Sequence, residues 1–98
     1  MQDEIRMIYP EMDEMKRIFA DGGRALEDLN SQVKQWATMV NDGALLGDAG
    51  EALAEAFTTR LSPKIQLLTE KMTELEGDIT KAVDDFQAAE KKAAGMFA

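Results

Sequence analysis

The stretch NDGALLGD, residues 41–48, decides the fold, because it places a short glycine-bearing turn at the middle of a 98-residue chain. Asn41 and Gly43 tolerate the left-handed backbone conformation that ends a helix. Asp48 and Glu51 have the spacing of a capping box, which opens a helix. We therefore predict a turn over residues 41–47 between one helix over about 10–40 and another over about 48–93.

Apolar and small residues recur on both sides of this turn in alternating steps of three and four. Before the turn they are Ile8, Met12, Met15, Phe19, Gly22, Leu26, Leu29, Val33, Trp36 and Val40. After the turn they are Ile65, Leu68, Met72, Leu75, Ile79, Ala82, Phe86, Ala89 and Ala93. This spacing predicts one apolar face on each helix and excludes β-structure.

A lone helical hairpin cannot bury a face of this length on both of its helices. We therefore expect an all-α chain, residues 1–98 forming a single domain, in which an antiparallel hairpin dimerises into a four-helix bundle. The core or dimer interface is predicted to contain Met15, Phe19, Leu26, Leu29, Val33, Trp36, Leu68 and Leu75.

Prolines and glycines modify the two helices. Pro10 suits the first helical position, where its missing N–H costs nothing. Pro63 removes a hydrogen bond inside the second helix, so we expect a kinked continuous helix, or else a break with Ser62 as a new N-cap. Gly22 and Gly23 either weaken the first helix or, at Gly22, let a partner helix approach closely.

The composition excludes several classes of function. The net charge of −8 and the scattered basic residues argue against binding to nucleic acid and against adsorption to anionic membranes. No stretch is long and apolar enough for stable membrane insertion, and the acidic N-terminus has no signal-peptide h-region. Secretion would therefore need a route that does not use a signal peptide.

The sequence contains few residues that could support catalysis or bind a metal ion. The chain has no histidine and no cysteine, and its two serines lie outside any nucleophile motif. The acidic clusters, such as Asp84-Asp85, are typical of a solvated helix face. The methionines and Trp36 are interpreted as packing residues. We expect no enzymatic activity, no metal and no cofactor.

The layout of two antiparallel helices around a central turn resembles the WXG100 (ESAT-6-like) family, small substrates and partners of type VII secretion systems. The family's Trp-x-Gly turn corresponds to Leu45, Leu46 and Gly47, and its Tyr-x-x-x-Asp/Glu export motif corresponds to Phe86 and Glu90. Its C-terminal pattern of apolar, acidic, apolar and apolar positions corresponds to Met72, Glu76, Ile79 and Val83.

Two positions depart from the family pattern. Leu45 stands where the family has tryptophan, and Phe86 stands where it has tyrosine. Tyr9 and Asp13 have the export spacing at the other end of the chain, and we interpret that match as coincidental. In the family, the turn of one subunit and the C-terminal motif of its partner together form a signal for an FtsK/SpoIIIE-type ATPase.

The resemblance implies a secreted protein with a cytoplasmic pool before export, which acts as a homodimer or pairs with a paralogous WXG100 protein. It leaves open whether the chain is a secreted effector or a chaperone. The alternative is a cytoplasmic helical scaffold or adaptor with the same architecture and no export role, and the missing tryptophan favours this alternative.

Overall fold

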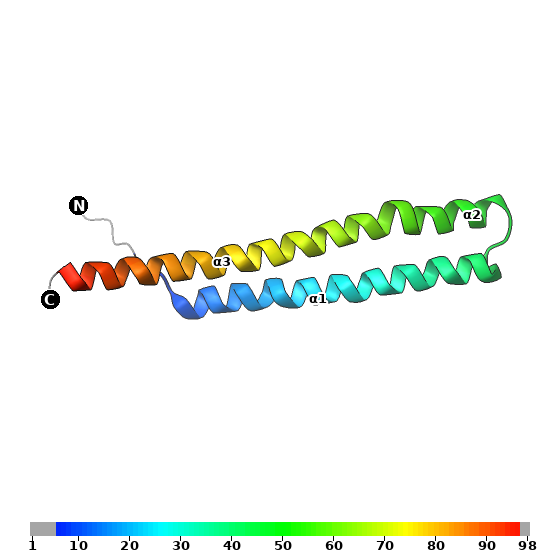
Figure 1. Ribbon diagram of the computed structural model, residues 1–98. Coiled ribbons are helices and arrows are strands. Elements are labelled where there is room, and N and C mark those ends of the chain that lie inside the picture. Colours follow the sequence, from blue (N-terminus) through cyan, green and yellow to red (C-terminus); the bar gives the residue numbers. More distant parts are fainter. Residues whose placement is uncertain (1–5, 97–98) are drawn as a thin grey trace, which may run out of the picture.

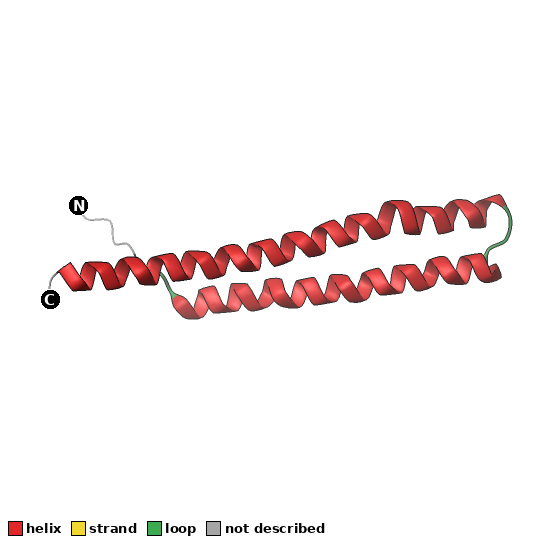
Figure 2. Cartoon of the chain, in the orientation of Figure 1, coloured by secondary structure: helices red, strands yellow, loops and turns green. Residues whose placement is uncertain are grey.

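The computed structural model describes residues 6–96, and within that range the chain is a helical hairpin without β-strands (Figures 1 and 2). Helix α1 covers Tyr9–Met39 and continues into a wider, π-type segment η1, Val40–Ala44. The returning arm consists of α2, Asp48–Glu55, a second π-type segment η2, Ala56–Leu61, and α3, Ser62–Met96. Residues 1–5 and 97–98 of the predicted domain lie outside the described residues.

Helix α1 begins and ends close to the predicted positions. It starts at Tyr9, so Pro10 is the second helical residue and not the first. The Ile8 carbonyl accepts hydrogen bonds from the N–H groups of Glu11 and Met12, both at 3.1 Å. At the other end the helical path stops at Gly43, whose φ of 114° is a conformation that other residues rarely adopt. No other described residue but Gly47 has a positive φ, so Asn41 does not help to end the helix in this way.

The predicted capping box at Asp48 and Glu51 is wrong. Gly47 is the N-cap of α2, and its φ of 85° and ψ of −166° suit glycine alone. Glycine has no side chain, so no side-chain cap bond forms, and the Gly47 carbonyl accepts the Glu51 N–H at 3.1 Å as the first hydrogen bond of α2. Asp48 and Glu51 instead lie in the first turn of α2, where their negative charges interact favourably with the positive end of the helix dipole.

The chain passes Pro63 without an intervening loop, because the turn before it is widened. In η2 the backbone hydrogen bonds join residues five apart instead of four. The Ser62 N–H, for example, donates to the Phe57 carbonyl. A wider turn accommodates the proline ring and the missing N–H. Ser62 is helical and buried and does not act as an N-cap; its hydroxyl donates to Asn30 Oδ1 on α1 at 2.5 Å.

The two arms pack through the same two heptad positions, which we call a and e. On the first arm the more buried residues at these positions are Met12, Lys16, Phe19, Gly23, Leu26, Asn30, Val33, Ala37 and Val40. On α3 they are Ser62, Ile65, Thr69, Met72, Glu76, Ile79, Val83 and Phe86. We call these sets the packed edges of the hairpin. Gly23 is buried here, and a Cβ at Gly23 would lie 3.7 Å from the Met72 Cβ.

The remaining half of the predicted apolar face is uncovered. Heptad position d holds Ile8, Met15, Gly22, Leu29 and Trp36 on the first arm and Leu61, Leu68, Leu75, Ala82 and Ala89 on the second. The large residues of this uncovered line, Ile8, Met15, Leu29, Trp36, Leu61, Leu68 and Leu75, are each 38–46% exposed. Of the eight predicted core or interface residues, Phe19, Leu26 and Val33 therefore face the other arm, and the other five do not form a core within one chain.

Both halves of the uncovered line lie on one side of the hairpin. Position d follows position a by three residues on each arm, so it lies on the same rotational side of each packed edge. The arms are antiparallel and face each other through their packed edges. Position d of the first arm and position d of the second arm therefore lie on the same face of the hairpin. The hairpin thus has one continuous apolar face along its length.

The shape of the molecule agrees with this exposed face. Its extents are 75 × 21 × 20 Å and its radius of gyration is 22.0 Å, whereas a globular domain of this length has a radius of about 13 Å. The chain exposes 7653 Å², against about 5,500 Å² for a globular monomer of its mass. Among the described residues only five apolar side chains are buried: Val33, Ala37, Val40, Ala54 and Ile65.

A glycine series tests the turn. A Cβ at Gly50 would lie 1.9 Å from the Leu45 carbonyl oxygen, so Gly50→Ala must displace the turn backbone. We expect it to lower the free energy of unfolding by about 1–3 kcal/mol. Gly77→Ala is the matched control, because nothing lies within 4 Å of its Cβ and alanine favours the helix; it should raise the free energy of unfolding by up to about 1 kcal/mol. Urea unfolding followed by circular dichroism measures both, and equal effects would contradict the close approach.

Candidate functional site

The residues predicted to carry an export signal lie at opposite ends of the hairpin. Leu45, Leu46 and Gly47 form the turn, whereas Phe86 and Glu90 lie near the free end of α3 (Figure 1). The molecule is 75 Å long, so one chain does not bring the two sets together. A site that contains both sets would need a second chain.

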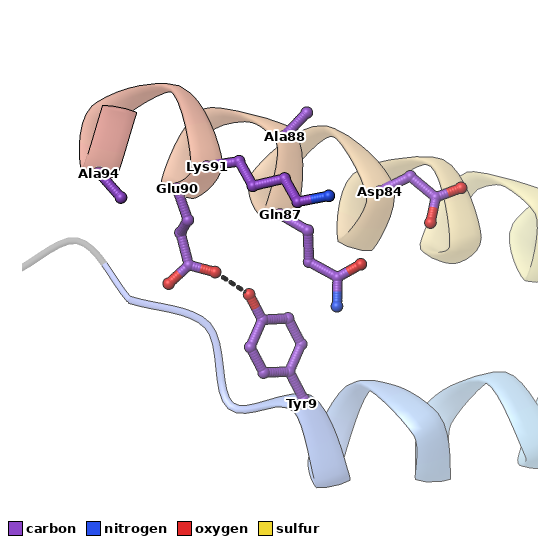
Figure 3. A pocket seen from close by; sticks show the side chains of 7 residues that line it. All are labelled: Tyr9, Asp84, Gln87, Ala88, Glu90, Lys91 and Ala94. Atoms are coloured by element: carbon purple, nitrogen blue, oxygen red, sulfur yellow. Dashed lines mark hydrogen bonds between the residues drawn. The ribbon is translucent and has the colours of Figure 1, made fainter. Parts of the chain in front are cut away.

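The free end of the hairpin carries an aromatic and acidic cluster, Tyr9, Phe86 and Glu90. The ring of Tyr9, in the first turn of α1, contacts Phe86 edge to face, with centroids 6.3 Å apart and planes at 67°. Its hydroxyl donates a hydrogen bond to Glu90 Oε1 (Figure 3). The cluster therefore fastens the start of α1 to the last third of α3.

This arrangement changes the meaning of two sequence features. Phe86 lacks a hydroxyl, but the phenol of Tyr9 lies beside it and reaches the carboxylate four residues further along α3. The cluster thus holds an aromatic hydroxyl and an acidic group, contributed by two helices instead of one. Tyr9 was not predicted as part of this site; its place directly before Pro10, at the start of α1, was the signal that it lies at the open end.

An open, shallow groove adjoins this cluster. It is lined by Tyr9, Asp84, Gln87, Ala88, Glu90, Lys91 and Ala94, and Figure 3 shows Tyr9 reaching up to the side chains of α3. The last turns of α3 extend beyond the start of α1 (Figure 1). The groove is lined by an aromatic ring and by side chains of both charges.

The surroundings of Tyr9 raise the pKa of its hydroxyl. The hydrogen bond to Glu90 raises the pKa of Tyr9 above its ordinary value of 10.0, with desolvation and the negative charge of Glu90 acting in the same direction. Each of these favours the neutral phenol. The hydrogen bond therefore contributes to stability below pH 10 and is lost as the pH rises through the higher pKa of the folded state.

The turn forms the second candidate region. Leu46 is 78% exposed and Leu45 is partly exposed, so the turn presents apolar side chains at the tip of the hairpin. Gly47 supplies the positive φ that starts α2, and Gly50 permits the close approach of the Leu45 carbonyl. The role of Gly50 was missed because the clash involves the backbone of the turn, which local sequence preferences do not reveal.

The C-terminal family pattern lies on a packed edge. Met72, Glu76, Ile79 and Val83 are all half-buried on the side of α3 that faces α1. Within one chain these residues hold the hairpin together, and they present little surface to a partner. Trp36 lies on the uncovered line and contacts Phe57 in a tilted arrangement, with centroids 6.0 Å apart.

Comparison with family models, with curated proteins and with solved structures finds no match for this chain. No helix within residues 6–96 is long and apolar enough to cross a membrane. In the same range, no three histidine, cysteine or acidic side chains are grouped so that they could hold a metal ion.

A titration tests the cluster at the free end. Tyr9 is the only tyrosine of the chain, so the ultraviolet absorbance of phenolate reports on it alone. We expect ionisation at a pH above 10 in the parent protein, and a fall of the pKa toward 10 in Glu90→Gln, which removes the negative charge. Asp84→Asn is the control, since it neutralises another carboxylate of the groove that does not bond Tyr9. Equal pKa values in the parent and in Glu90→Gln would contradict the effect of the Glu90 charge on Tyr9.

Proposed function

We propose that this chain is a small, non-enzymatic helical protein that acts as a dimer and is exported by, or assists, a type VII secretion system. The observation that supports pairing is the uncovered line, whose large residues Met15, Leu29, Trp36, Leu68 and Leu75 are each at least 38% exposed. The export role is proposed from the WXG100 resemblance. A second hairpin laid on this face completes a four-helix bundle.

The area available supports pairing. The chain exposes about 2,100 Å² more than a globular monomer of its mass. A stable protein–protein interface takes about 800 Å² from each partner. One face of the hairpin can therefore supply an ordinary interface and still leave the ends of the molecule free for other contacts.

Dimer formation would also assemble the two ends. When two hairpins pair with their turns at opposite ends, Leu45 and Leu46 of one chain approach the free end of the other, where Phe86 and Glu90 lie. This is the composite arrangement that the WXG100 resemblance implies for recognition by an FtsK/SpoIIIE-type ATPase. The proposed location is outside the cell, reached without a signal peptide, with a cytoplasmic pool before export.

A cytoplasmic helical scaffold or adaptor is the second candidate. Leu45 in place of the family's tryptophan favours it, because the turn then lacks the aromatic ring of the family pattern. Both candidates need the uncovered line for pairing, and they differ in whether the ends of the bundle are read by a secretion ATPase.

Pairing is tested by light scattering on the purified protein. The double variant Leu29→Asp/Leu68→Asp places charge on the uncovered line and should be monomeric at concentrations where the parent is dimeric. Leu67→Asp is the control: Leu67 is 55% exposed but lies off the uncovered line, so this variant should stay dimeric. A monomeric parent protein would contradict the proposal.

Export is tested by comparing culture supernatants of a host that carries the secretion ATPase with those of the same host lacking it. Phe86→Ala and Glu90→Ala should each reduce secretion while the purified variants remain helical dimers. Secretion of these variants at the parental level would rule out the assignment of the signal, and retention of the parent in the cytosol would favour the adaptor.

A further inference from the structure

Met15 places a thioether on the uncovered line. Its side chain is 41% exposed in the hairpin, and it supplies the only sulfur among the residues that form the line. The other side chains of the line are hydrocarbon, apart from the indole of Trp36. A mild oxidant that spares hydrocarbon therefore meets a reactive group on this face at Met15.

The chain contains no thiol that would compete for such an oxidant, because it has no cysteine. Two of its methionines, Met12 and Met72, are half-buried on the packed edges. Met39 and Met96 are more exposed than Met15, at 53% and 76%, but neither belongs to the uncovered line. Among the described methionines, Met15 alone combines an exposed side chain with a place on that line.

Oxidation of a thioether by hydrogen peroxide is a two-electron step that needs no metal or cofactor. The sulfur attacks one peroxide oxygen, the sulfur–oxygen bond forms, and the oxygen–oxygen bond breaks. The hydroxide that leaves takes the proton from the transferred oxygen and becomes water. The product is methionine sulfoxide, a polar side chain with a strong hydrogen-bond acceptor in place of an apolar one.

The effect of a sulfoxide at Met15 differs between the single hairpin and a pair of hairpins. In the single hairpin the new oxygen lies at an exposed position, where water satisfies it, and the packed edges are unchanged. Pairing through the uncovered line would bury that oxygen among hydrocarbon side chains. An acceptor buried without a donor disfavours the paired state.

We infer that Met15 is an oxidation site that controls pairing: a peroxide converts its thioether to the sulfoxide in the single hairpin, and the sulfoxide prevents the uncovered line from being covered. The inference rests on the proposed pairing and adds its regulation. Because a partner hairpin covers the line, the paired protein is protected, and oxidation removes chains from the unpaired pool.

Mild treatment with hydrogen peroxide, followed by peptide mass spectrometry and sedimentation, tests the site. Chains that carry one added oxygen at Met15 should have a dimer dissociation constant at least about tenfold higher than the parent. Their circular dichroism should remain helical. The rate of oxidation at Met15 should also fall as the protein concentration rises, because pairing covers the sulfur.

A pair of matched variants separates Met15 from the other methionines. Met15→Leu removes the sulfur and conserves the side-chain volume, so it should pair as the parent does and stay paired after peroxide treatment. Met15→Leu/Leu67→Met returns a thioether at an exposed position off the line; it should be oxidised there and remain dimeric. Methionine sulfoxide reductases should restore pairing of the oxidised parent.

The outcomes distinguish this inference from the pairing itself. A parent protein that is monomeric before any oxidation overturns the pairing and the inference together. A dimeric parent that keeps its affinity with Met15 fully converted to the sulfoxide overturns the inference alone. Equal loss of pairing in the parent and in Met15→Leu after peroxide treatment also overturns it, because the effect then belongs to another residue.

Discussion

The contact between α1 and α3 along one edge of each helix is the constraint on which the rest of the molecule depends. Two helices touch along a single seam, so each can bury about two of its seven heptad positions against the other. This chain uses a and e for that seam, where Val33, Ala37 and Ile65 are buried. Position d is apolar as well, and a two-helix structure has nothing with which to cover it. This geometry explains why position d stays exposed and why the molecule is elongated. It is also the reason for proposing a partner.

The ends of the hairpin are built differently from its middle. At the turn, Gly43, Gly47 and Gly50 let the backbone reverse with carbonyl and amide groups in close contact. At the free end, the Tyr9 hydrogen bond to Glu90 holds the first turn of α1 against α3. The middle is held by apolar contact and by the Ser62–Asn30 hydrogen bond, which joins the arms beside the widened turn before Pro63. Each end is thus an ordered surface that pairing would leave available.

Much of the hairpin could be predicted from the sequence, because the steps of three and four and the central glycines act locally. The stripe of apolar residues correctly located two helices, but it could not show that residues such as Phe19 and Val33 face the other arm while Leu29 and Trp36 do not. That division depends on the rotation of one helix against the other, which tertiary packing sets. The helix start at Asp48 was predicted correctly, but its N-cap was not: Gly47 takes the non-helical backbone conformation, so the cap lies one residue earlier than predicted. The link between Tyr9 and Glu90 joins residues 81 apart and follows only from the register of the two arms.

The central claim is that folding is completed by a second chain, and the concentration dependence of thermal unfolding tests it most directly. If the uncovered line is buried in a dimer, dilution favours dissociation and the Tm falls as the protein concentration is lowered. The account predicts a Tm that rises steadily over a hundredfold increase in concentration, with helicity lost in the same transition. A Tm independent of concentration, for a protein that sediments as a monomer throughout, would contradict it.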